Sequence, residues 1–492
     1  MSITRFVTAD GLPAFLAHLS KSARVLAPVE KPGNKTAVVF EPWKEGKPFT
    51  LAKATVPAKE AVLPQCEVLV RYSKTKDPND PGKCTMTLDD TPQAEPTVVF
   101  GSRPCDARGY VTLDRPYLHG PFADPYYKAR RDQLTVITLT CPSGCSTCFC
   151  HWVGGGPTSP EGSDVLMTEV EGGYVLQAMT DKGAALLEGS SLADGADRFA
   201  DAEAARKAAW ASLEKAPSLA EAPAKVAARF EDVEFWQQET DRCLSCGACT
   251  YFCPTCYCFN ITDEGDGLNG REGRRLRTWD NCMSPLFTRE ASGHNPRTAK
   301  ALRMRNRVSH KFATYPENWG AFSCNGCGRC VSNCPVHLDI RAIVLDAINK
   351  ITLGSIDLAD IEASTRTIPF DIVIPNDTKN VSGVDQANVT VTIRNKATAV
   401  IRATNITFIH VPEGLEPTSV TKQVQVTIRA ATSEIQKITA NNIRVVADLA
   451  DFSLPGTNTV PVTIYIDGYP DAGYIGDYTI VVSLAEKTDD KG

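Results

Sequence analysis

The chain has 492 residues, of which 42% are hydrophobic and 22% charged, a composition typical of a globular protein with room for about two to four domains. Its formal net charge of −6 argues against a nucleic-acid-binding protein, which would show a basic face. The chain has no run of 18 apolar residues, and its N-terminal segment lacks the apolar core of a signal peptide. We therefore expect a cytoplasmic protein without a membrane span, in which clustered cysteines favour metal binding over disulfides.

Residues 1–195 alternate strand-like apolar runs, such as TAVVF, PTVVFG and LTVITLT, with short helical stretches. This pattern predicts an α/β N-terminal domain. Residues 196–230 are rich in alanine and charged residues, which predicts a helical connector.

Five cysteines of the N-terminal domain predict a metal cluster of their own: Cys105, Cys141, Cys145, Cys148 and Cys150. Cys105 follows one strand-like run and Cys141 ends another, so strand ends at one edge of a sheet can bring them together. An iron–sulfur cluster is the simplest account, but the spacing does not say which of the five is spare. Cys66 and Cys84 stand alone, and we expect them to be buried apolar residues.

Residues 231–350 predict a mostly helical ferredoxin-type domain. The motif C-x2-C-x2-C-x3-C-P occurs twice, beginning at Cys243 and at Cys324. In two-cluster ferredoxins the fourth cysteine of such a motif binds the other cluster. Zinc sites instead pair two short hairpins of ligands, which disfavours zinc here. We predict two [4Fe–4S] clusters, the first held by Cys243, Cys246, Cys249 and Cys334, and the second by Cys324, Cys327, Cys330 and Cys253.

Three more cysteines, Cys256, Cys258 and Cys282, lie near the first motif in the sequence. They either bind a further metal or donate S–H hydrogen bonds to the neighbouring cluster, and both roles are favoured over a free redox dithiol. A long polar insertion separates the two motifs, and we expect it to be helical. Its basic residues either offset cluster charge or form a solvated face: Arg271, Arg274, Arg275, Arg277, Arg303, Arg305, Arg307 and Lys311.

Residues 356–492 predict a separate all-β domain, because short runs such as NVTVTIRN and QVQVTIRA alternate apolar and polar residues. This region contains no cysteine. Residues 356–487 resemble a YbbR-like β module, with one nearly complete copy at about 385–487. The segment 356–375 resembles the end of a preceding copy.

The motifs RPCDARGY, CFCHWVGGGP, CLSCGACTYFCPTCYCF and CNGCGRCVSNCPV follow one another within residues 1–350. Together they resemble the iron–sulfur β-type subunit of cytoplasmic NiFe sulfhydrogenases, a family that includes the A subunit of anaerobic sulfite reductase. The resemblance implies electron transfer between a flavin subunit that handles NAD(P)H and a catalytic subunit. It also implies that Cys105, Cys141, Cys148 and Cys150 hold the third cluster, which leaves Cys145 spare.

The sequence shows no glycine-rich nucleotide-binding motif and no arrangement of a nucleophile with a base, so we predict no catalytic or nucleotide-binding residues. We expect a non-catalytic electron-transfer subunit with three [4Fe–4S] clusters. The alternative is a self-sufficient iron–sulfur enzyme that binds its own substrate at a cluster. That function requires an open iron in a cluster with three cysteines, whereas each predicted ferredoxin-type set supplies four.

Overall fold

The computed structural model describes residues 3–80, 82–265, 270–349, 356, 365–372 and 384–487. Two compact units divide the chain, Met1–Lys350 and Ile351–Gly492. The chain is therefore multidomain, as the composition change predicted, while the boundaries near residues 195 and 230 remain predictions. Across the described ranges, no helix combines the length and apolarity that crossing a bilayer requires.

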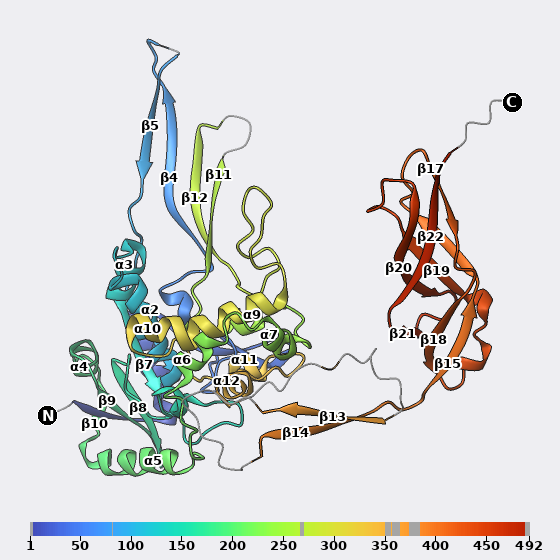
Figure 1. Cartoon of the computed structure of the whole chain (residues 1–492). Helices are drawn as coiled ribbons and strands as arrows, with labels where there is room; N and C mark the ends of the chain where they lie inside the picture. Colours follow the sequence, from blue (N-terminus) through green and yellow to red (C-terminus); the bar gives the residue numbers. More distant parts are fainter. Residues whose placement is uncertain are drawn as a thin grey trace. The chain divides into compact units, whose positions relative to one another are not determined.

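An eight-stranded mixed sheet forms the frame of the first unit, with strand order β10-β1-β9-β8-β7-β6-β2-β3 (Figure 1). The central strands β2, β6, β7 and β8 run parallel, and the outer pairs are antiparallel. The strands are β1 (Thr4–Thr8), β2 (Arg24–Lys31), β3 (Asn34–Pro42), β6 (Thr97–Ser102), β7 (Leu134–Leu139), β8 (Val165–Val170), β9 (Gly173–Ala178) and β10 (Ala193–Asp194). This arrangement confirms the predicted α/β class.

Helices cover both faces of this sheet, because its buried strands alternate their side chains between two cores. Phe100 packs with residues of α1 and α4, whereas its neighbour Val99 packs with residues of α2 and α3. The helices of this part are α1 (Leu12–Leu19), α2 (Pro104–Leu118), α3 (Pro125–Gln133), α4 (Asp181–Glu188) and α5 (Phe199–Ala211).

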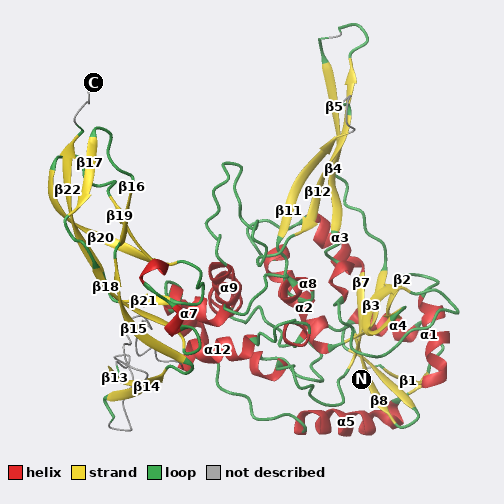
Figure 2. Cartoon of the chain, turned by 90° about the vertical axis from the view of Figure 1, so that its right-hand side faces the viewer, coloured by secondary structure: helices red, strands yellow, loops and turns green. Residues whose placement is uncertain are grey.

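A second, four-stranded antiparallel sheet extends away from these helices (Figures 1 and 2). Its order is β11-β12-β4-β5, so it joins strands from both halves of the first unit. The strands are β4 (Cys66–Lys76), β5 (Cys84–Asp89), β11 (Phe259–Gly265) and β12 (Glu272–Trp279). The prediction of a helical insertion is therefore wrong for Glu264–Gly265 and Glu272–Trp279, which belong to β11 and β12; a helix begins only at Lys300.

Short helices surround the cysteine motifs, and most of them share one apolar core. They are α6 (Ala222–Ala228), α7 (Val233–Thr240), α8 (Ala248–Tyr251), α9 (Lys300–Ser309), α10 (Tyr315–Trp319), α11 (Arg329–Ser332) and α12 (Ile340–Asn349). A π-helical turn, His310–Thr314, joins α9 to α10. The last helix, α12, contributes Ile343, Val344 and Ala347 to the core, so the motif region needs this helix.

The second unit is built of β-strands in its described part, as predicted. A hairpin, β13-β14, precedes two sheets of order β15-β18-β21 and β16-β19-β20-β22-β17, which share one core. The strands are β13 (Thr365–Asp371), β14 (Gln386–Thr392), β15 (Lys396–Ala403), β16 (Asn405–Ile409), β17 (Leu415–Ser419), β18 (Val424–Ala431), β19 (Ile443–Asp448), β20 (Gly456–Ile466), β21 (Gly473–Ile475) and β22 (Tyr478–Glu486). Of the predicted partial copy at 356–375, residues 357–364 and 373–375 lie outside the described residues.

A chain truncated after about residue 352 is expected to fold and to keep its iron, because each unit has its own core and no cysteine follows Cys334. Iron analysis and the visible absorption spectrum measure this outcome. The isolated segment 356–492 serves as the control, and should be colourless with a β-type circular dichroism spectrum. A truncated chain that bound no iron, even when cut several residues later, would contradict the boundary.

Candidate metal centre

The two cysteine motifs adopt the same backbone conformation. Ser245 and Gly326, each two residues after the first cysteine of its motif, have φ angles of 56° and 63°. Gly247 and Gly328 follow with φ angles of 78° and 75°, and each precedes a short helix, α8 or α11. These left-handed residues turn each loop back on itself, as a loop that wraps one cluster must do.

The second loop also packs closely against the cysteine-rich segment of the N-terminal domain. A Cβ at Gly326 would lie 2.5 Å from the backbone of Phe149 and Cys150, and one at Gly328 would lie 2.6 Å from Thr147 O. Glycine is required at both positions by this close approach as well as by the positive φ. The loop of the second motif is therefore held directly against residues 147–150.

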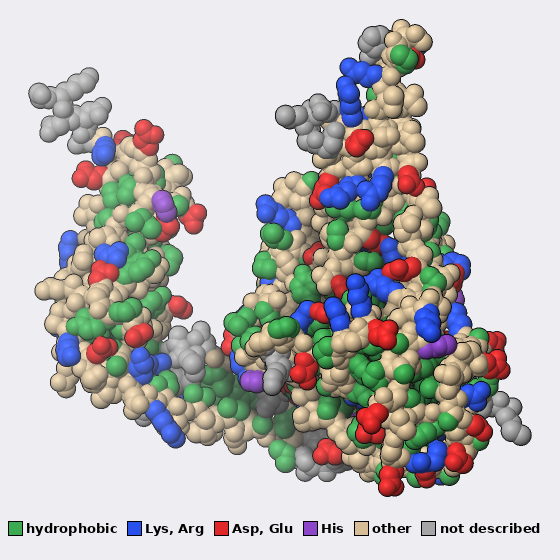
Figure 3. All heavy atoms as spheres, turned by 180° about the vertical axis from the view of Figure 1, so that it is seen from behind, with side chains coloured by type: hydrophobic (Ala, Val, Ile, Leu, Met, Phe, Trp, Pro, Cys, Tyr) green, Lys and Arg blue, Asp and Glu red, His purple; other side chains and the backbone are tan. Residues whose placement is uncertain are grey.

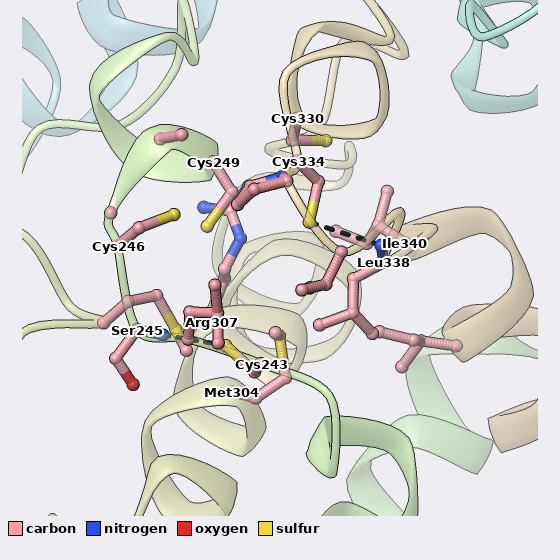
Figure 4. Close-up of a pocket in the computed structure, with 17 residues that line it drawn as sticks. Cys243, Ser245, Cys246, Cys249, Met304, Arg307, Cys330, Cys334, Leu338 and Ile340 are labelled. Carbon is pink, nitrogen blue, oxygen red and sulfur yellow. Dashed lines mark hydrogen bonds between the residues drawn. The ribbon is translucent and has the colours of Figure 1, made fainter.

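The first thiol site comprises Cys243, Cys246, Cys249 and Cys334, which line one pocket (Figure 4). These four cysteines are those predicted for the first cluster, and the last comes from the second motif. Backbone N–H groups donate to two of the sulfurs: Ser245 N to Cys243 Sγ over 3.4 Å, and Leu338 N to Cys334 Sγ over 3.3 Å. N–H groups that donate to the ligand sulfurs offset the negative charge of an iron–sulfur cluster, so the pocket suits such ligands.

The central thiol site comprises Cys253, Cys324, Cys327 and Cys330, the set predicted for the second cluster. Its cysteines are buried or nearly so, with Cys324 and Cys327 each 7% exposed. Burial, together with the neighbouring thiols, raises the pKa of Cys324 to about 11 and that of Cys330 well above its usual value. Iron binding would displace these protons, because metal ligands must be deprotonated.

The third thiol site comprises Cys105, Cys141, Cys145, Cys148 and Cys150, which line one pocket together with Cys327. Cys105 lies in the first turn of α2 after β6, and Cys141 lies just beyond β7, which pairs in parallel with β6. The carboxyl ends of these strands thus meet at one edge of the sheet, as the sequence predicted.

Cys145 differs from the other thiols of the third site because it is exposed. Lys53 Nζ lies 3.7 Å from Cys145 Sγ and donates to Cys327 O over 2.6 Å. A hydrogen bond from Cys148 and the charge of Lys53 lower the pKa of Cys145 to about 4. Lys53 thus offers this thiolate a partner other than iron.

The comparisons with known proteins agree with this arrangement. Residues 242–338 match the family described as the 4Fe-4S dicluster domain. The sulfhydrogenase 2 subunit beta of Pyrococcus furiosus is 32% identical over 263 residues, which cover 51% of this chain and 74% of that protein. This chain belongs to the sulfhydrogenase β-subunit family. It is an iron–sulfur electron-transfer subunit with [4Fe–4S] clusters, as the motifs predicted.

Two solved structures are similar to a smaller part of the chain. The YbbR-like domain of the lmo2119 protein from Listeria monocytogenes is 21% identical, and the match covers 19% of this chain and 99% of that chain, with a TM-score of 0.17. A YbbR-like protein from Streptococcus pneumoniae TIGR4 is 23% identical, and the match covers 19% of this chain and 48% of that chain, with a TM-score of 0.16.

In this member of the sulfhydrogenase β-subunit family, the thiols suit clusters better than single ions. Within the described ranges, no three His, Cys, Asp or Glu side chains converge closely enough to hold one metal ion. The cysteines of a cubane each bind a different iron and therefore stand further apart than the ligands of one ion. The N–H groups that point at Cys243 and Cys334 fit this use of the thiols.

The three additional cysteines separate into two groups. Cys256 lies beside Cys253 of the central thiol site, and its Sγ accepts a hydrogen bond from Arg307 Nη1 over 3.3 Å. The side chains of Cys258 and Cys282 share a hydrogen bond at the base of the β11–β12 hairpin, and both are free cysteines. Asp280 N donates to Cys258 O over 2.9 Å at the same place. Of the two predicted roles, hydrogen bonding near a cluster fits this geometry better than a further metal.

Six of the eight basic residues predicted to offset cluster charge or form a solvated face divide into two groups. Arg274 and Arg275 form exposed ion pairs with Glu264 and Asp263. Basic and acidic side chains are interspersed on the face of the molecule that Figure 3 shows. Four others are buried: Arg277, Arg303, Arg307 and Lys311. Arg307 and Lys311 face the thiols, so the predicted charge compensation applies to these two.

Two further basic residues near the thiols, Lys53 and Lys59, were missed by the sequence analysis. Both lie in residues 50–62, which contain no motif and no periodic pattern that would mark them. The prediction that Cys66 and Cys84 are buried is wrong, because both are exposed on the second sheet. They lie at the first positions of β4 and β5, and β5 is an edge strand.

Proposed function

We propose that the chain relays electrons through three [4Fe–4S] clusters, between a subunit that binds flavin and NAD(P)H and a catalytic oxidoreductase subunit. A [4Fe–4S] cluster accepts and donates one electron at a time. The first, central and third thiol sites would each hold one cluster, and Cys145 would remain free. No residue of this chain would act as a catalyst.

The sharing of cysteines between neighbouring sites carries this proposal. Cys330 belongs to the central thiol site and also lines the pocket of the first site. Cys327 belongs to the central site as well and lines the pocket of the third. Since each outer site adjoins the central one, electrons would pass in the order first, central and third, or the reverse.

Exposure of the outer sites supports the role of a conduit. Cys246 of the first site and Cys145 of the third are exposed, whereas the cysteines of the central site are not. Partner subunits could therefore exchange electrons at two separate places on the surface. Purification of the complex from native cells with a tagged chain, followed by mass spectrometry, should recover a flavoprotein; its absence would contradict the proposed partner.

Iron and sulfide analysis of the anaerobically purified chain is expected to give about twelve of each per chain, because each cubane holds four. Cys150→Ala should lose about four irons. Cys145→Ala is the matched control, and should keep about twelve because Lys53 already compensates its thiolate. Four or fewer irons in the unmodified chain would contradict the proposal, and equal losses in both variants would contradict the assignment of Cys145.

A further inference from the structure

Three buried cations converge on Cys253 and Cys256, beside the central thiol site. Lys59 and Arg307 are each 4% exposed, and Lys311 is 2% exposed. Lys59 comes from the N-terminal domain, whereas Arg307 and Lys311 lie four positions apart on the continuous helical segment of residues 300–319. We call these three residues the cation triad.

The hydrogen bonds of the triad go to neutral groups or to a thiol. Lys59 Nζ donates to Cys256 O over 3.1 Å and lies 4.0 Å from the centroid of the Trp279 ring. Lys311 Nζ donates to Thr255 Oγ1 over 2.9 Å. Arg307 Nη1 donates to Cys256 Sγ over 3.3 Å, and Figure 4 shows its side chain among the cysteines.

No salt bridge within the described ranges joins a carboxylate to any member of the triad. Two other buried arginines of this unit differ, since Arg329 pairs with Asp106 and Arg277 pairs with Glu67. Burying three like charges without a carboxylate costs several kcal/mol per ion unless another anion compensates them. The groups that face the triad and can carry negative charge are cysteines of the first and central sites, together with Cys256 and Cys258.

His310 lies on the same helical segment and experiences the positive charge of the triad. Its Nε2 lies 3.1 Å from Tyr257 Oη. Burial, followed by the charges of Lys311 and Arg307, lowers the pKa of His310 to about 4. The imidazole is therefore uncharged at pH 7, and His310 adds no positive charge to those of the triad.

We propose that the cation triad raises the reduction potential of the cluster held at the central thiol site, an inference that rests on the proposed function. Reduction adds one electron to this site, delivered from the neighbouring reduced cluster, and takes up no proton. The added negative charge lies beside the three cations of the triad in a medium of low dielectric constant, so the reduced state is stabilised more than the oxidised state. The triad thus makes the cluster at the central thiol site easier to reduce.

Potentiometric titration followed by electron paramagnetic resonance tests this proposal in the full chain. The signal of the central cluster is identified as the one lost in Cys324→Ser. In Lys311→Met and in Lys59→Met, the ratio of reduced to oxidised central cluster at the unmodified midpoint potential should fall at least threefold, which is about 28 mV for one electron. Methionine keeps much of the length of the lysine side chain while removing its charge.

Arg305→Met is the matched control, because Arg305 lies on the same helix but donates to Phe230 O over 3.0 Å and pairs with Glu231. Its removal should leave the midpoint potential of the central cluster unchanged. A change of less than threefold in both lysine variants, at full iron content, would overturn the inference while leaving the proposed function intact. If Lys311→Met loses the central cluster, retention of that cluster in Lys311→Arg supports the role of charge, and its loss in both variants overturns it.

Discussion

Replacing Cys334 with serine is expected to remove the cluster at the first thiol site and to leave the cluster at the central thiol site in place. Cys334 is the last cysteine of the second motif, yet it lines the pocket formed by the first three cysteines of the first motif. Its Sγ accepts a hydrogen bond from Leu338 N, which orients the sulfur toward that pocket. Iron analysis should show a loss of about four irons per chain.

Electron paramagnetic resonance then identifies the cluster that is lost. Cys253→Ser should have the reverse effect, since Cys253 faces the thiols of the second motif. Cys84→Ser is the matched control, because Cys84 is exposed on β5 and lines none of the three thiol sites. Loss of the central cluster in Cys334→Ser would show that each motif keeps its own fourth cysteine.

The spacing of the cysteines predicted which thiols come together because a ferredoxin-type motif is local. Within each loop, left-handed residues such as Gly247 and Gly328 turn the backbone back on itself and bring the first three cysteines of the motif together. The meeting of Cys105 and Cys141 could be predicted for a similar reason, since parallel strands end at the same edge of a sheet.

The β11–β12 hairpin could not be predicted in the same way. Strands are found in sequences by the alternation of buried and exposed side chains, but every residue of β11 is exposed. Only Phe259 and Ile261 alternate with polar residues there, and the polar run that follows them shows no period of two. Lys59 was missed because its contact with Cys256 depends on how the N-terminal domain packs against the cysteine motifs.

Asp106 and Arg329 form a buried ion pair between α2 and α11, at the junction of the two halves of the first unit. Asp106 is 3% exposed and Arg329 is 2% exposed. Two guanidinium nitrogens meet the two carboxylate oxygens, with Nη2 and Oδ2 2.9 Å apart, and Arg329 Nε donates to Ala54 O over 2.8 Å. The pair thus ties the sheet domain to the helix that begins within the second cysteine motif.

Replacing Asp106 with asparagine is expected to lower the free energy of unfolding of the first unit by about 3–5 kcal/mol, because a buried guanidinium loses its counter-ion. Asparagine keeps an oxygen that can accept the hydrogen bond from Arg103 N, so the start of α2 is preserved. The urea midpoint of the anaerobic protein, followed by circular dichroism, measures the change. Asp263→Asn is the matched control, since its ion pair with Arg275 is exposed and should leave the midpoint unchanged.

A double variant separates the loss of a counter-ion from the loss of packing. Asp106→Leu combined with Arg329→Met removes both charges and keeps apolar volume in the site, so it should be more stable than Asp106→Leu alone. The difference arises because the single variant leaves the Arg329 charge buried without a carboxylate, next to the thiols of Cys105 and Cys327. A double variant as unstable as the single one would show that the packing of α2 against α11 depends on the shape of these two side chains. Their charges would then contribute little to the free energy of unfolding.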